Sequence, residues 1–120
     1  LMEDQEGNMW NGTGFGLDVL EKTSGRFIHY LNDASNPSSI SNNSIMSLLE
    51  DSRGLIWIGT QGGLNLFDKK AKTFKVFNEQ NGLPHNSILT LIEDNQGNIW
   101  MGTPKRLSKK VVSKSDKRKY

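Results

Sequence analysis

The chain has 120 residues, of which 34% are hydrophobic, and it contains no cysteine. Disulfides and thiol chemistry are therefore excluded, and no stretch approaches the roughly 18 apolar residues of a membrane span. The formal net charge of +2 is unevenly distributed, because residues 1–103 carry 7 Lys and Arg against 12 Asp and Glu, whereas residues 104–120 carry 8 against 1. The chain thus combines a mildly acidic body with a strongly basic tail.

One eleven-residue phrase occurs three times. It reads EDQEGNMWNGT at 3–13, EDSRGLIWIGT at 50–60 and EDNQGNIWMGT at 93–103. Its tryptophans are 47 and 43 residues apart, which is the period of propeller blades and not that of helical arrays. The four additional residues of the first interval fall in residues 32–43, a segment of Asn, Ser, Asp and Pro that is typical of a loop. The spacing therefore predicts stacked blades with one longer connection.

The first two predicted blades follow this repeat in chain order. Residues 1–31 form a partial blade, in which NMWNGT, GLDVLE and RFIHYL are strands and two residues remain of the opening strand. Residues 32–78 form a complete blade with its leading loop. Its four strands are predicted at 44–51, 55–60, 64–68 and 73–78.

The third blade is predicted to be incomplete. Residues 79–103 supply two strands, SILTLIED and NIWMGT, and then Pro104 stands where a flexible hairpin residue is expected. Residues 104–120 are predicted to be a disordered basic tail. The predicted fold class is therefore all-β, a β-propeller fragment of about two and a half four-stranded antiparallel blades.

Three residue types recur in every repeat and are predicted to build the blade. The Asp before each turn can accept hydrogen bonds from the turn amides, and the Gly three residues later suits a backbone with positive φ. Each Trp lies in mid-strand, where its ring can cover about 150 to 250 Å² of apolar surface between adjacent sheets. These structural residues are Asp4, Asp51, Asp94, Gly7, Gly54, Gly97, Trp10, Trp57 and Trp100.

The repeated phrase resembles that of a known family. E-D-x-x-G-x-[IM]-W-x-G-T, followed by G-L-[ND]-x-[LF] and an aromatic strand, is similar to the two-component regulator propeller repeat over residues 1–103. This repeat is found in the periplasmic sensor region of hybrid two-component system histidine kinases of Bacteroides-type bacteria. The resemblance implies a sensor propeller that takes part in signal transduction by binding a glycan-derived ligand. It also implies a periplasmic location, although no signal peptide precedes Leu1 in this chain.

Two other motifs share part of the phrase. The Asp box of sialidases, S-x-D-x-G-x-x-W, has one residue fewer between Asp and Gly than DSRGLIW has. Streptogramin lyase propellers use D-x-x-G-x-[IVL]-W, which fits better, but their catalytic His and Glu cannot be placed on this chain. No grouping of nucleophile, base and oxyanion donors is visible, and kinase and receiver domains are absent from the sequence. We therefore predict no catalytic residue and do not expect the chain to be an enzyme.

Four polar residues are candidate ligand contacts. Asn36, Gln61, His85 and Asn86 lie in loops and turns that a propeller would place on the face around its central channel. Amide-rich loops with an occasional ring suit the hydroxyl groups of sugars. The two histidines of the chain have no metal-binding spacing, so neither a metal nor a cofactor is predicted.

The incomplete ring determines the expected partners. Propellers close with about four to eight blades, so two and a half blades leave two interblade faces open. We expect the chain to self-associate or to pack on the remaining blades of a longer chain. An oligosaccharide is the expected ligand, nucleic acid is not expected, and a membrane would be reached only through parts absent from this chain. The alternative function is a non-catalytic propeller scaffold for protein interaction or dimerisation.

Overall fold

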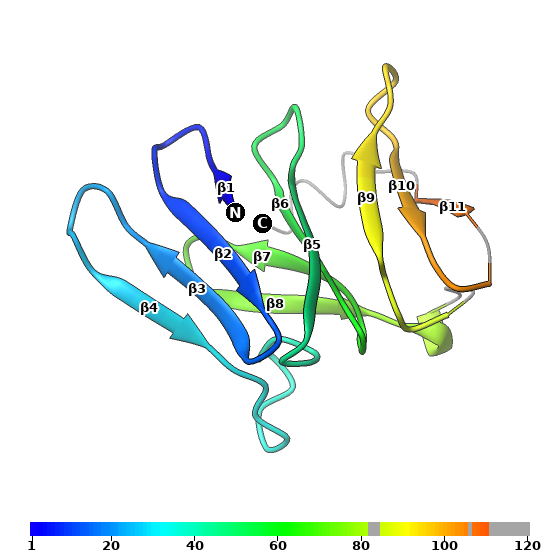
Figure 1. Ribbon diagram of the computed structural model, residues 1–120, viewed down its shortest axis with the longest axis horizontal. Coiled ribbons are helices and arrows are strands. Elements are labelled where there is room, and N and C mark those ends of the chain that lie inside the picture. The colour runs from blue at the N-terminus through cyan, green and yellow to red at the C-terminus, as the bar shows by residue number, and fades with distance from the viewer. Residues whose placement is uncertain (82–84, 106, 111–120) are drawn as a thin grey trace.

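The computed structural model describes residues 1–81, 85–105 and 107–110. They form three antiparallel sheets that follow one another across the molecule, from the blue sheet to the orange one in Figure 1. The first sheet comprises β1 (Met2–Glu3), β2 (Met9–Thr13), β3 (Gly16–Leu20) and β4 (Phe27–Tyr30). Each strand pairs with the next one in the sequence.

The second sheet is complete and the third has three strands. The second comprises β5 (Ile45–Glu50), β6 (Ile56–Thr60), β7 (Gly63–Asp68) and β8 (Thr73–Phe77). A short 3-10 helix, η1 (Glu79–Asn81), follows it. The third comprises β9 (Thr90–Glu93), β10 (Ile99–Gly102) and β11 (Leu107–Lys110). This arrangement confirms the predicted all-β propeller fragment of four-stranded antiparallel blades.

The end of the third blade differs from the prediction. β11 pairs with β10 from Gly102↔Leu107 to Ile99↔Lys110, so the blade extends beyond the boundary set at residue 103. Pro104 lies in the connection between these two strands and does not have to donate a ladder hydrogen bond there. Residues 111–120, the remainder of the predicted tail, lie outside the described part of the chain.

Apolar residues fill the two seams between the blades. At the first seam the buried cluster is Trp10, Leu17, Val19, Ile40, Ile56, Ile58, Phe67 and Phe74. At the second seam it is Leu55, Trp57, Leu64, Leu66, Ile88, Ile99 and Met101. Successive side chains of a strand point to opposite faces, so Ile56 and Ile58 of β6 face the first seam while Trp57 faces the second. The middle blade is therefore buried on both faces.

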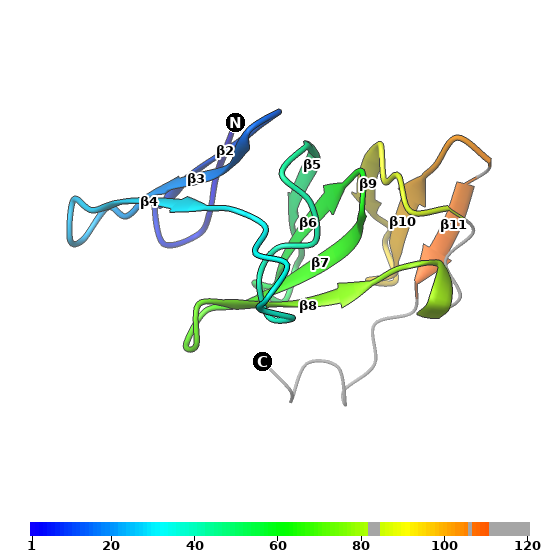
Figure 2. The same ribbon diagram turned by 90° about the horizontal axis from the view of Figure 1, so that it is seen from below.

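The long loop between β4 and β5 crosses the middle blade (Figure 2). Ser38 accepts a hydrogen bond from the backbone N–H of Phe74 at 2.8 Å, and the backbone N–H of Ser41 donates to Asn65 Oδ1 at 3.0 Å. Ile40, between these two anchors, is fully buried in the first seam. The loop inserted into this repeat thus contributes to the core as well as connecting two strands.

Candidate functional site

The turn between the first two strands of each blade is organised around its aspartate. Asp4 Oδ1 accepts hydrogen bonds from the backbone N–H groups of Glu6 and Asn8, both at 2.9 Å. Its other oxygen, Oδ2, accepts one from the indole Nε1–H of Trp10 at 2.9 Å. The equivalent indole bonds in the other turns measure 2.9 Å for Trp57 to Asp51 and 2.8 Å for Trp100 to Asp94. Each aspartate therefore links its turn to the tryptophan of the following strand.

These hydrogen bonds lower the pKa of two of the turn carboxyls. For Asp94, the indole N–H of Trp100 and the backbone N–H of Asn98 hold the pKa at about 2, below its ordinary value of 3.8. For Asp4, burial is the largest single influence and raises the pKa, but the bonds from Trp10, Asn8 and Glu6 together outweigh it. The turns of Asp4 and Asp94 are thus built around ionised carboxylates at neutral pH.

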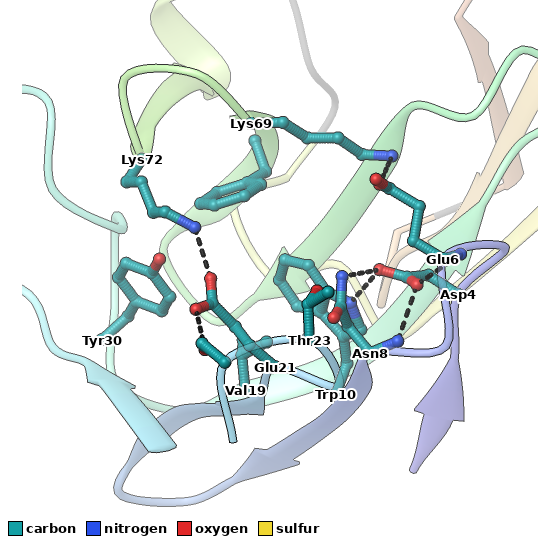
Figure 3. A pocket seen from close by; sticks show the side chains of 12 residues that line it. Asp4, Glu6, Asn8, Trp10, Val19, Glu21, Thr23, Tyr30, Lys69 and Lys72 are labelled. Carbon is teal, nitrogen blue, oxygen red and sulfur yellow. Dashed lines mark hydrogen bonds and ion pairs between the residues drawn. The ribbon is translucent and has the colours of Figure 1, made fainter. Parts of the chain in front are cut away.

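A pocket of about 230 Å³ lies between the first two blades and opens beside the Asp4 turn (Figure 3). We call it the interblade pocket. The rings of Trp10, Tyr30 and Phe67 form its apolar part, and the charged groups of Glu6, Glu21, Lys69 and Lys72 form its polar part. Apolar walls with a few convergent polar groups are typical of small-molecule sites.

The aromatic part of the pocket is held by edge-to-face packing across the seam. Trp10 and Tyr30, from the first blade, lie with ring centroids 5.1 Å and 5.6 Å from that of Phe67 in the second blade, at interplanar angles of 80° and 71°. Tyr30 is only partly buried and lines the pocket. Burial, with a smaller contribution from Glu21, raises the pKa of Tyr30 to about 12, so the phenol is a hydrogen-bond donor at neutral pH.

Two ion pairs across the seam form the polar part of the pocket. Lys72 Nζ lies 2.5 Å from Glu21 Oε2, and Lys69 Nζ lies 3.0 Å from Glu6 Oε1, so both lysines of the second blade contact the first. Lys72 has a φ of 59°, which is unusual for a residue other than glycine and costs backbone strain. The Lys72 ammonium and the Glu21 carboxylate therefore present a hydrogen-bond donor and an acceptor side by side in the pocket.

The four ligand residues predicted from the sequence are held by different segments. Asn36 lines a second, outer cavity with Tyr30 and Lys72, and it caps its own loop by accepting from the backbone N–H of Ser38. Gln61 is exposed in the β6–β7 turn.

The other two share the loop that leads to the third blade. His85 accepts a hydrogen bond from the backbone N–H of Ser87, and Asn86 accepts one from that of Glu79. Asn86 therefore holds η1 to this loop. The contacts of the four residues are local, and none of the four lines the interblade pocket.

The sequence interpretation missed the charged residues of the interblade pocket. Glu6 and Glu21 lie in turns of the first blade, and Lys69 and Lys72 lie in a turn of the second, so their convergence depends on how two blades stack. The KKAK turn was visible only as a polar stretch. Within the described part of the chain, no group of three or more potential ligands could hold a metal ion. No described helix is long and apolar enough to cross a membrane.

Comparison with known proteins supports the repeat assignment. The family model for the two component regulator propeller matches residues 39–62 and 82–105, which hold the second and third copies of the phrase. No curated protein sequence matches the chain.

Several solved structures share the fold. The extracellular domain of a hybrid two component system of B. thetaiotaomicron superposes with a TM-score of 0.71 at 25% identity, over 86% of this chain and 14% of that one. A second such domain from the same organism gives 0.66 at 27% identity, over 95% and 17%. PorZ, a surface component of the type-IX secretion system of Porphyromonas gingivalis, gives 0.68 over 88% and 16%, and at 22% identity this likeness shows the fold alone.

This chain spans less than a fifth of the length of each of these three. The repeat spacing, the three stacked sheets and the match of the family model all agree. Two segments of the chain therefore match the two component regulator propeller family, and its fold is that of the extracellular domains of hybrid two component systems.

Proposed function

We propose that the chain is part of the sensor propeller of a hybrid two-component regulatory system and binds a glycan-derived ligand outside the cytoplasm. The observation that carries this proposal is the similarity, at 25% identity over 86% of the chain, to the extracellular domain of such a system. The chain spans 14% of that domain. The role proposed for these residues is binding and not catalysis.

The interblade pocket is the place where we expect the ligand. A sugar ring has an apolar C–H face and a rim of hydroxyl groups, and Tyr30 offers an aromatic ring beside the carboxylate of Glu21 and the ammonium of Lys72. Neutral hydroxyls can exchange hydrogen bonds with both members of an ion pair without separating their charges. These features support a saccharide over a purely apolar ligand.

The connecting loops offer a second location for the same ligand. Gln61, His85 and Asn86 are the predicted contacts there, and Asn36 lies nearer the outer cavity. Variants of Gln61, His85 and Asn86 can distinguish the two locations, because none of these three residues lines the interblade pocket.

The test is an oligosaccharide array probed with this chain. We expect Lys72→Gly to weaken binding at least about ten-fold, since it removes the ammonium while suiting the left-handed backbone and so preserving the fold. Tyr30→Phe, which keeps the ring and removes the hydroxyl, should weaken binding less. Gln61→Ala is the matched control for the interblade pocket. If Gln61→Ala weakens binding and the two pocket variants do not, the ligand binds at the connecting loops and not in the interblade pocket.

A second function is favoured by a specific observation. Met46, Leu89 and Ile92 are large apolar side chains with exposed fractions of 40%, 38% and 63%. Exposed apolar groups of this kind suit a protein partner, so the alternative is a non-catalytic scaffold for protein interaction or dimerisation. Absence of binding to every oligosaccharide on the array would contradict the glycan proposal and favour the scaffold.

A further inference from the structure

The glutamates that open the second and third repeated phrases each join their blade to the preceding one. Glu50 Oε1 accepts a hydrogen bond from the backbone N–H of Gln5 at 2.9 Å. Glu93 Oε1 accepts one from the backbone N–H of Ser52 at 2.8 Å, and its Oε2 accepts one from the Ser52 hydroxyl at 2.6 Å. In both cases the donor is the residue directly after the turn aspartate. We call this contact the glutamate clasp.

The turn leaves this one amide available to a neighbour. Asp51 accepts from the backbone N–H groups of Arg53 and Leu55, so the N–H of Ser52 is not used within its own turn. Adjacent residues of a strand point to opposite faces, so Glu93 can face the preceding blade while Asp94 stays with its own turn. A carboxylate that accepts a backbone N–H makes a stronger bond than a neutral acceptor does.

An equivalent glutamate lies on the outer face of the first blade, and an equivalent turn amide lies on the outer face of the third blade. Glu3 pairs with Met9 in its sheet as Glu50 pairs with Ile56, so it holds the equivalent place, and it is exposed. Asn95 follows the third turn aspartate as Ser52 follows the second, and it too is exposed.

Apolar side chains that are covered by a neighbouring blade at the first seam have exposed equivalents on the outer face of the first blade. At the first seam, Trp10 packs on Phe67, which pairs in register with Phe74, and each of the two phenylalanines is only 5% exposed. The residues at the equivalent places of the first blade are Leu20 and Phe27, which also pair in register. Their exposed fractions are 40% and 69%.

The third blade presents the complementary side chain. Trp10 and Trp57, which a following blade covers, are 2% and 0% exposed, whereas Trp100 is only partly buried. One end of the described structure thus carries a tryptophan and a turn amide. The other end carries an apolar surface and a glutamate.

We propose that these two ends bind each other between two copies of this chain. Trp100 of one copy packs on Leu20 and Phe27 of the other, and Glu3 accepts the backbone N–H of Asn95. The contact continues the interblade interface that the molecule already contains twice. Two copies contribute six sheets, which lies within the four to eight blades of closed propellers. This inference rests on the proposed function only in that the chain acts as a unit of a propeller.

Sedimentation equilibrium of the chain and four variants tests the pairing. We expect a dimer in the micromolar range, weakened at least about ten-fold by Phe27→Asp and by Glu3→Ala. Phe15→Asp is the matched control for the first, because Phe15 is 84% exposed in the β2–β3 turn, away from the proposed contact. Glu79→Ala is the control for the second, because Glu79 is exposed on η1. Circular dichroism should show that all four variants remain folded.

Three results would overturn the inference. They are a wild-type chain that stays monomeric, association that continues beyond the dimer, and equal weakening by Phe27→Asp and its control Phe15→Asp. A monomer would leave the two faces to other blades of a longer protein. Oligosaccharide binding is measured separately with the same Phe27→Asp variant. Loss of the dimer with binding intact would therefore count for the pairing without counting against the sensor function.

Discussion

The bond between each turn aspartate and a tryptophan six residues later shows what the sequence does and does not reveal about single residues. The recurring Asp and Gly predict a hydrogen-bonded turn, and Asp94 Oδ1 does accept from the backbone N–H groups of Gln96 and Asn98. The indole bond of Trp100 to Oδ2 was not predicted, although tryptophan N–H groups generally find a partner when they are covered. Its geometry depends on the strand returning beside the turn.

Asp94 should make the stability of the chain depend on pH. Its folded-state pKa of about 2 lies below the ordinary 3.8, so the ionised form stabilises the fold above pH 3.8 and this contribution disappears as the pH falls toward 2. Asp94→Asn should therefore lower the melting temperature at pH 5, and the difference from the wild type should shrink between pH 4 and pH 2. Thermal denaturation followed by circular dichroism measures it. A difference that stays constant over this range would contradict the assignment.

At the scale of elements, the repeat pattern predicted most strands, but it missed β11, which forms by pairing with β10. The middle blade has the predicted strand order, with bounds that differ by at most one residue at each end. β11 was missed because Pro104 and the lysines around it suggest a tail, whereas pairing with β10 is a tertiary contact. The first two blades approach each other closely at Gly12, where an added Cβ would overlap the side chain of Ile45 in β5.

Gly12→Ala should destabilise the first seam. The new methyl group would force apart two packed strands of different blades, and overpacking of this kind costs about 1 to 3 kcal/mol. Gly14→Ala is the matched control, because nothing lies within 4 Å of a Cβ at that position and its φ is not positive. The measurement is urea denaturation of the two variants and the wild type. Equal free energies of unfolding for the two variants would show that the blades are not in close contact at Gly12.

At the scale of the whole molecule, three blades meet at two seams, and each seam has its own clusters and charge pairs. Lys69 and Lys72 pair with glutamates across the first seam, and Arg53 reaches across the second. The charge convergence in the interblade pocket could not be predicted, because the repeat spacing places blades in order without fixing which turn side chains meet. Stability should accordingly be a sum of blade and seam contributions, as in other repeat proteins.

Breaking one seam should loosen the blades beside it and leave the other seam intact. Arg53 Nη1 donates to the backbone oxygen of Gly97 at 3.0 Å and lies 3.7 Å from the Glu93 carboxylate, so Arg53→Ala removes contacts across the second seam, together with an ion pair to Asp51 in its own turn. We expect amide exchange, measured by mass spectrometry in dilute solution, to speed up about ten-fold in β9 and β10 while β2 and β3 keep their rates, because a hydrogen bond to a charged group contributes about 1.5 to 3 kcal/mol.

Lys69→Ala is the reciprocal variant and should act on the first seam instead. It removes an exposed ion pair with Glu6, which contributes about 0.2 to 1 kcal/mol, so its effect on β2 and β3 should be the smaller of the two. Opposite exchange patterns for the two variants would establish that the seams open independently. A uniform increase across all three blades with either variant would mean that the fragment unfolds as one cooperative unit, and the additive description of its stability would then fail.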